Sequence, residues 1–123
     1  MAAGLAAFFN IQLQNGASVV IKESQVEKRL PGTDMIITGE GRLDQQSVRG
    51  KVVAGIAAAG NQHNIPVIAI CGENALNEDD IAAAGLSKVY PLVNENTSKE
   101  YAMVNAASLV SANAALIMNK CIR

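Results

Sequence analysis

Five charged side chains and three glycines are concentrated in one short stretch of this 123-residue sequence. They lie between residues 38 and 51, and they are Glu40, Arg42, Asp44, Arg49, Lys51, Gly39, Gly41 and Gly50. Carboxylates such as those of Glu40 and Asp44 bind divalent cations, and either group can accept the proton of a hydroxyl nucleophile. The planar guanidinium of Arg42 matches a carboxylate or a phosphate, and Lys51 can add a point charge. The stretch is therefore typical of a site for a small anion and a metal ion.

The glycines of this stretch fit the same interpretation. Gly39 and Gly41 allow the backbone to approach a ligand closely or to adopt a positive φ, and amides at a following helix N-terminus attract anions. A structural interpretation stays open beside it, in which Glu40 pairs with Arg42, Asp44 caps the helix and Lys51 is solvated. Because the spacing matches neither the GxxxxGK[ST] nor the GxGxxG pattern, residue types alone leave both interpretations open.

Strands and helices are predicted to alternate around this stretch. Apolar runs at 35–37 and 66–71 predict buried parallel strands, and 88–92 predicts a third, shorter one. Helices are predicted over 2–12, 46–62, 77–84 and 98–120, with Asn77 and Ser98 as caps of the last two. Residues 18–30 favour a helix that starts at Ser18, with a strand at 19–21 as the alternative. The pattern predicts a three-layer, Rossmann-like α/β domain over residues 1–123, with a parallel sheet and helical crossovers.

Ligands of open α/β sheets bind at the carboxyl ends of the strands, which is where residues 38–51 fall. Two other polar stretches, 73–80 and 94–97, follow the second and third predicted strands. We expect the acids of 73–80 to interact with the dipole of a short helix, and 94–97 to form a polar turn. His63 is expected at a helix C-terminus and Cys71 in the core.

Composition argues against several classes of partner. A net charge of −1 with only two tyrosines, two phenylalanines and no tryptophan gives little basis for binding nucleic acid. The apolar stretch 2–9 is too short to cross a bilayer, so no membrane association is expected. Neither Cys71 nor Cys121 belongs to a CxxC pair or a Cys/His cluster, which favours a reducing cytoplasm.

The run DMIITGEGRLDQQS at 34–47, followed by Gly50-Lys51 and by NIPVIAICG at 64–72, resembles the C-terminal part of bacterial type I glycerate kinases. The resemblance covers most of the chain. Members of that family are several times longer, so it implies the C-terminal fragment of a larger two-domain enzyme. It also implies transfer of the γ-phosphoryl group of ATP to a hydroxyl of D-glycerate, with Mg²⁺.

The resemblance implies a role for each charged residue of the run. Glu40 and Asp44 match acidic positions, where one carboxylate deprotonates or orients the glycerate hydroxyl and the other acts through Mg²⁺, in an order that stays open. Arg42 and Lys51 match basic positions suited to the substrate carboxylate or to the transferring phosphoryl oxygens.

The resemblance implies that uncharged residues of the run also contribute to substrate binding. Gln45 and Ser47 match polar positions that orient the loop or cap the helix, and Gly39 and Gly41 are expected beside the substrate. Because phosphoryl transfer needs both substrates and the metal in one water-poor cleft, we expect the chain alone to be inactive and to need the rest of the kinase. Apolar surface that the rest would cover also predicts a homodimer, through the first or last helix.

The sequence leaves two other functions open. One is a Rossmann-like module that binds a nucleotide or flavin for electron transfer, although the GxGxxG pattern is missing. The other is a non-catalytic ligand-binding domain, because the fold alone does not determine function.

Overall fold

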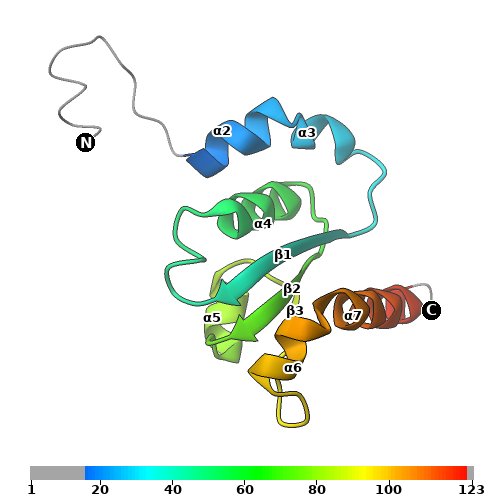
Figure 1. The fold of residues 1–123 in the computed structure, drawn as a ribbon. Coiled ribbons are helices and arrows are strands. Elements are labelled where there is room, and N and C mark those ends of the chain that lie inside the picture. The colour runs from blue at the N-terminus through cyan, green and yellow to red at the C-terminus, as the bar shows by residue number, and fades with distance from the viewer. Residues whose placement is uncertain (1–15, 122–123) are drawn as a thin grey trace, which may run out of the picture.

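A parallel sheet of three strands organises the computed structural model, which describes residues 16–121. The strands are β1 (Ile36–Leu43), β2 (Val67–Asn74) and β3 (Lys88–Pro91), in the order β1-β2-β3. Helices lie on both faces of the sheet (Figure 1). The predicted three-layer α/β architecture with helical crossovers is confirmed.

Among residues 16–121, four helices lie on one side of the sheet and two on the other. The first side has α2 (Gly16–Glu23), α3 (Val26–Arg29), α4 (Val52–Gln62) and α5 (Glu78–Ala83). The second side has α6 (Lys99–Val104) and α7 (Ala106–Cys121). α2 packs on α4 rather than on the sheet, since a Cβ on Gly55 of α4 would clash with Ile21 of α2. No helix among these is long and apolar enough to cross a membrane.

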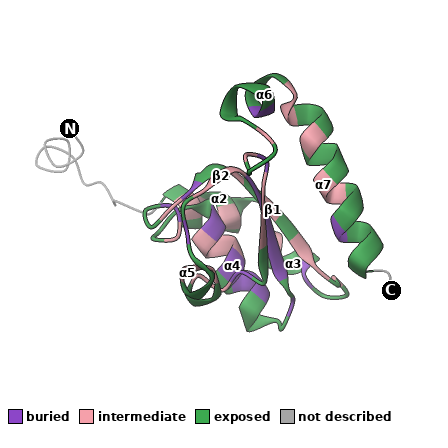
Figure 2. Cartoon of the chain, turned by 90° about the horizontal axis from the view of Figure 1, so that it is seen from below, coloured by how far each residue is buried: buried purple, intermediate pink, exposed green. Residues whose placement is uncertain are grey.

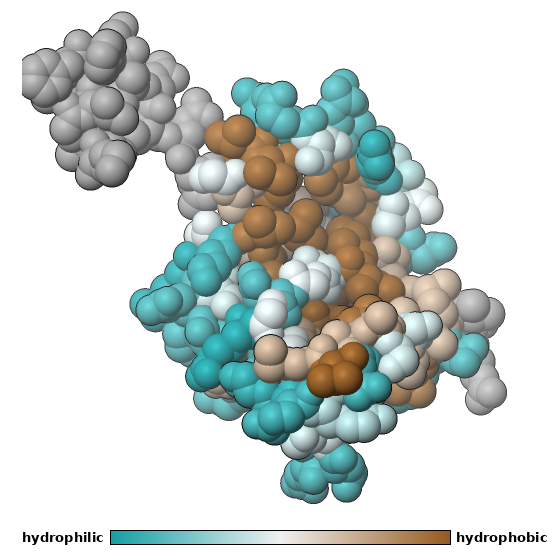
Figure 3. Space-filling model, in the orientation of Figure 1, coloured by the Kyte–Doolittle hydropathy of each residue, from teal (hydrophilic) through white to brown (hydrophobic). Residues whose placement is uncertain are grey.

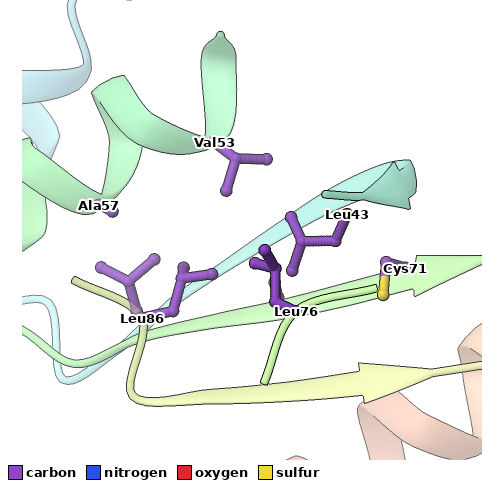
Figure 4. Close-up of a cluster of buried hydrophobic side chains, with 8 residues drawn as sticks. Leu43, Val53, Ala57, Cys71, Leu76 and Leu86 are labelled. Atoms are coloured by element: carbon purple, nitrogen blue, oxygen red, sulfur yellow. The ribbon is translucent and has the colours of Figure 1, made fainter. Parts of the chain in front are cut away.

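β2 is buried on both faces, which explains why its sequence is a continuous apolar run. Val67, Ala69 and Cys71 face α4 and α5, in a cluster that includes Leu43 and Val53 (Figure 4). The alternate residues, Ile68 and Ile70, pack with Leu92, Ala102 and Ile117 beneath α6 and α7. Figure 2 shows buried residues on the strands and on α4, whereas α7 is largely exposed. The two cores fix the sheet between its helical layers.

The end of the first strand, predicted at residue 37, is the main point on which the sequence prediction was wrong. β1 continues through the glycines to Leu43, because it pairs with β2 from Ile36↔Val67 to Leu43↔Asn74. Glycine has a weak strand propensity, but the neighbouring strand supplies the ladder of hydrogen bonds. β2 also extends beyond its predicted end at 71, to Asn74. The charged residues of the run are therefore positioned by a strand.

The helix predicted over 46–62 begins later, at Val52. Gly50 has a φ of +77°, which a continuous right-handed helix does not allow, and Lys51 is extended. Residues 44–51 instead form turns between β1 and α4. This places the polar residues of 44–51 at the edge of the sheet rather than along a helix.

The helix predicted over 98–120 is two helices. Asn105 interrupts it with a φ of −108° and a ψ of 21°, and its side-chain amide donates to the Tyr101 carbonyl at 2.9 Å. Ser98 caps α6 as predicted, since its hydroxyl accepts from the Tyr101 amide at 3.2 Å. The apolar side chains of these two helices are only partly buried: Ile117 is 1% exposed, whereas Met103 is 73% exposed.

Two other predicted helical segments have mixed outcomes. Asn77 caps α5 as predicted, accepting from the Asp80 amide at 2.8 Å. α2 begins at Gly16, ahead of the predicted cap at Ser18, and Gln25 separates it from α3 with a left-handed φ of 52°. The alternative strand at 19–21 is therefore wrong. The helix predicted over 2–12 lies outside the described residues.

Candidate functional site

Four charged side chains meet at the carboxyl end of β1 and β2. Arg42 lies beside Glu73 in the register, and their Nη1 and Oε2 atoms are 3.5 Å apart. Arg42 Nε lies 3.7 Å from Asp44 Oδ2, and Lys99 Nζ of α6 lies 2.6 Å from Glu73 Oε1. We call Arg42, Asp44, Glu73 and Lys99 the carboxyl-edge cluster. It combines two strands and a helix into one site.

A tight turn holds Asp44 in this cluster. The amides of Gln46 and Ser47 donate to Asp44 Oδ1 at 3.0 and 2.9 Å. Ser47 is 1% exposed, and its hydroxyl donates to the Arg42 carbonyl at 2.8 Å. Asp44 therefore caps the turn that follows β1 rather than the N-terminus of α4.

The same contacts hold the pKa of Asp44 below its ordinary value. The Ser47 amide is the largest cause, followed by the Ser47 hydroxyl, and the Gln46 amide and the positive charge of Lys51 add to it. Partial burial acts in the opposite direction. Asp44 is therefore ionised at neutral pH, as a metal ligand or proton acceptor must be.

We expect Ser47→Ala to raise the pKa of Asp44, because the Ser47 hydroxyl, which lies 3.0 Å from Asp44 Oδ1, is lost while the Ser47 amide remains. A pKa that is lowered by folding stabilises the folded chain above the unfolded pKa, and this contribution is lost as the pH falls through the folded pKa. An NMR titration of the Asp44 carboxyl carbon measures the shift, with exposed Ser111→Ala as the control. An Asp44 pKa that is the same in both variants would contradict this account.

Glu40 lies on β1 two residues before Arg42, opposite Cys71. Its Oε1 accepts from the Gly41 amide at 3.0 Å. The pairing with Arg42 that the structural interpretation allowed is not found among residues 16–121, where the ion pairs of Arg42 are to Asp44 and Glu73. Burial, with a smaller contribution from Glu40, raises the pKa of the Cys71 thiol to about 11, so Cys71 is a core residue and not a nucleophile.

The other predicted site residues lie in β1, in the turn that follows it and just before α4. Lys51 precedes α4 and acts on Asp44 through its charge, and Gln45 is exposed in the turn. Gly39 and Gly41 belong to β1, and positive φ values are confined among the described glycines to 32, 50 and 85. A Cβ on Gly41 would meet no atom within 4 Å, and one on Gly39 would lie 3.6 Å from the Ile70 carbonyl oxygen. Packing within the described chain therefore requires neither glycine.

Two hollows open beside Gly41. One, of about 350 Å³, is lined by Arg42, Glu73 and Lys99 together with apolar residues of α6. The other, of about 500 Å³, lies along β1 and α7 and includes Gly39 and Glu40. The candidate site is thus open to a ligand.

Glu73 and Lys99 are the two cluster residues that the sequence analysis missed. The acidic run 73–80 was assigned to a helix dipole, which fits Glu78, Asp79 and Asp80 in the first turn of α5. Glu73, however, belongs to β2. Extending the parallel pairing of the two predicted strands beyond their apolar runs was the available signal, because it brings Glu73 beside Arg42. No comparable signal pointed to Lys99.

Comparison with known proteins gives this site a family. The model of the glycerate kinase family matches residues 1–122. The chain belongs to the glycerate kinase family. The resemblance noted in the sequence is thereby confirmed.

The relatives that this chain matches are much longer than it is. It is 36% identical over 110 residues to the glycerate kinase of Halalkalibacterium halodurans, covering 89% of the chain and 29% of that protein. It is 32% identical to glycerate 2-kinase of Escherichia coli K12, covering 76% of the chain and 24% of that protein. A crystal structure from Salmonella typhimurium LT2, assigned as a glycerate kinase 2, matches with a TM-score of 0.57 and 31% identity, over 94% of this chain and 32% of that one. The chain thus spans about 29% of the length of the Halalkalibacterium relative.

Glu40 and Asp44 are the two metal ligands that the sequence analysis predicted for this chain. Within residues 16–121, no group of three histidine, cysteine or acidic side chains is placed to hold a metal ion by itself. Mg²⁺ keeps several waters and takes one or two carboxylates together with substrate phosphates. The ionised Asp44 fits that donor set, and Glu40, four residues before it in the chain, is the second predicted carboxylate.

Proposed function

We propose that this chain supplies the acidic part of a glycerate kinase active site, for transfer of the γ-phosphoryl group of ATP to a hydroxyl of D-glycerate. One observation carries the proposal. In a chain of this family, an ionised Asp44, held by Ser47, lies beside Arg42 at an open carboxyl edge of a parallel sheet. Such an edge is where open α/β sheets bind their ligands.

The proposed roles follow from the charges. One of the carboxylates of Glu40 and Asp44 accepts or orients the proton of the glycerate hydroxyl, and the other binds the phosphate donor through Mg²⁺. Arg42 and Lys51 stabilise the negative charge of the substrate carboxylate or of the transferring phosphoryl oxygens.

The remaining proposed residues position these groups. The buried Ser47 holds the backbone of the turn, and the exposed Gln45 is available to a ligand. The strand glycines Gly39 and Gly41 leave room for substrate, since packing does not require them.

Phosphoryl transfer is proposed to need more than this chain. Catalysis there depends on holding both substrates and the metal in one water-poor cleft, and the candidate site is an open edge. The rest of a glycerate kinase chain is the proposed partner that closes it, with residues 1–123 acting as one α/β domain in a larger two-domain enzyme. The cytoplasm is the proposed compartment.

Self-association is proposed for the isolated chain. Hydrophobic atoms form a band across the face that carries α4 and β1 (Figure 3), and α7 exposes Val110, Leu116 and Met118 at 41–44%. Exposed apolar surface of this kind favours association. Sedimentation of the purified chain should therefore reveal a homodimer, and Leu116→Glu on α7 should weaken it.

The proposed site is tested by NMR titration of the purified chain with D-glycerate and Mg²⁺. We expect shifts at the Arg42 side chain and at residues 44–51, with affinity at least about tenfold weaker for Asp44→Asn, because a charge-assisted contact is lost. Asp79→Asn, in the first turn of α5, is the matched control. Equal affinity of the two variants would refute the assignment.

The same sample tests whether the chain acts alone. With ATP, Mg²⁺ and D-glycerate, we expect no turnover above background. Glycerate-dependent hydrolysis or transfer by this chain would refute its proposed dependence on the rest of the kinase, whatever the binding result.

A further inference from the structure

The 350 Å³ hollow beside the carboxyl-edge cluster has two chemically different parts. Its floor is apolar and consists of Leu92, Val93, Ala102 and Ala106, and the lining also includes Met103, which is 73% exposed. Its rim carries the charged side chains of Arg42, Glu73 and Lys99. We call it the β2–α6 pocket. Two cations and one carboxylate stand on this rim, which favours a ligand that is apolar at one end and anionic at the other.

The apolar floor distinguishes between the two substrates of the proposed reaction. Glycerate is a small acid in which every carbon carries oxygen, so apolar side chains would only desolvate it. A purine ring is broad and planar, and it gains free energy when such a surface covers it. The floor therefore favours the nucleotide over the sugar acid.

The wall of the pocket is formed by strand backbone. Gly41 and Gly72 both line it, so no side chain projects from β1 or β2 at this level. Gly72 is required by packing, because a Cβ there would lie 2.5 Å from the Gly41 carbonyl oxygen. Gly41 is not, since a Cβ there would meet no atom within 4 Å. The space beside Gly41 is thus left open, and a flat ring can lie against it.

The rim presents two cations to an anionic ligand. Glu73 contacts both, with Lys99 Nζ at 2.6 Å and Arg42 Nη1 at 3.5 Å, so it keeps the two side chains close together. The Lys99 hydrogen bond is the main reason why the pKa of Glu73 lies below its ordinary value. Arg42 also faces Asp44, which links the pocket to the proposed reaction site.

We infer that the β2–α6 pocket binds the phosphoryl donor, with the purine base on the apolar floor and the phosphates toward Lys99 and Arg42. The assignment rests on the proposed function and adds to it two contact residues, Lys99 and Met103, and one positioning residue, Glu73. No group of the glycerate molecule is placed in this pocket.

Four probes separate the parts of this inference: adenosine, ADP, tripolyphosphate and D-glycerate, each titrated into the ¹⁵N-labelled chain. Adenosine and ADP should shift the amides of Val93, Ala102 and Ala106. Tripolyphosphate should shift the resonances of the Arg42 side chain and leave the amide resonances of the floor unchanged. D-glycerate with Mg²⁺ should shift residues 44–51 and leave the floor unchanged.

Two pairs of variants provide matched controls on exposed positions. Lys99→Met should weaken the affinity for ADP about tenfold and the affinity for adenosine less than about twofold, because only the phosphate contact is lost. Lys120→Met should leave both affinities unchanged. The affinity for ADP should be at least about threefold weaker in Met103→Glu than in Val104→Glu. Val104 is the next residue of α6, is 85% exposed and does not line the pocket.

A positioning role for Glu73 makes its own prediction. Glu73→Gln should weaken the affinity for ADP. Glu73→Asp should keep part of that affinity, since an aspartate can still hold the two cations together. A Glu73 that merely competes with phosphate for Lys99 would instead give tighter ADP binding in Glu73→Gln.

The outcomes that overturn the assignment are distinct from those that refute the proposed function. Adenosine that leaves the floor amides unshifted at millimolar concentration would overturn it, and so would ADP that shifts only other residues. Tripolyphosphate that binds as tightly as ADP would reduce the site to a phosphate contact. If D-glycerate still shifts residues 44–51 in those cases, the proposed function stands and only the nucleotide pocket is wrong.

Discussion

Leu43→Ala is expected to lower the free energy of unfolding by about 2–5 kcal/mol. Leu43 is the last residue of β1, is 0% exposed and packs with Val53 and Leu76 under α4 (Figure 4). Truncating a side chain that is so fully enclosed loses both its transfer free energy and its contacts around the new cavity. Since small domains are stable by only about 5–15 kcal/mol, a large part of the stability depends on this residue.

Urea denaturation followed by circular dichroism measures this change, with Val104→Ala as the control. Val104 lies on α6 and is 85% exposed, so its truncation should cost less than about 1 kcal/mol. Because Leu43 lies between Arg42 and Asp44, Leu43→Ala should also loosen the carboxyl-edge cluster and broaden the Arg42 side-chain resonance. Equal destabilisation by the two variants would show that α4 does not enclose Leu43 as described.

Gly72→Ala is expected to destabilise the chain by about 1–3 kcal/mol and to move the cluster. The new Cβ would lie 2.5 Å from the Gly41 carbonyl oxygen, and backbone cannot move aside as a flexible side chain can. Relief requires β1 and β2 to separate between the pairs Glu40↔Cys71 and Arg42↔Glu73. The contact between Arg42 and Glu73 should lengthen as a result.

Gly41→Ala is the control for this prediction, since the two glycines lie on neighbouring strands. A Cβ on Gly41 meets no atom within 4 Å, and its φ is not positive. We expect its stability to be unchanged or raised by about 0.4–1 kcal/mol, because alanine restricts the unfolded chain more than glycine does. Thermal unfolding of both variants provides the comparison. A Gly72→Ala chain as stable as Gly41→Ala would contradict the close approach of the strands.

Local sequence predicted those parts of the fold that depend on local physics. The apolar, β-branched runs at 35–37 and 66–71 became β1 and β2, and the oxygens of Asn77 and Ser98 cap α5 and α6 as expected. Caps and buried strands can be read this way because a capping hydrogen bond and a buried apolar run involve neighbouring residues. The same reasoning failed at 38–43, where pairing with β2 overrides the weak strand propensity of glycine.

The sequence by itself determined which groups are available for chemistry, Glu40, Arg42 and Asp44 among them, and which family the chain resembles. Only the tertiary structure decided the neighbours of these groups. Arg42 contacts Glu73 because the two strands pair in one particular register, and Lys99 reaches Glu73 because α6 begins over the end of β2. Residue types carry no information about such contacts, since they arise from the packing of elements that are distant in sequence.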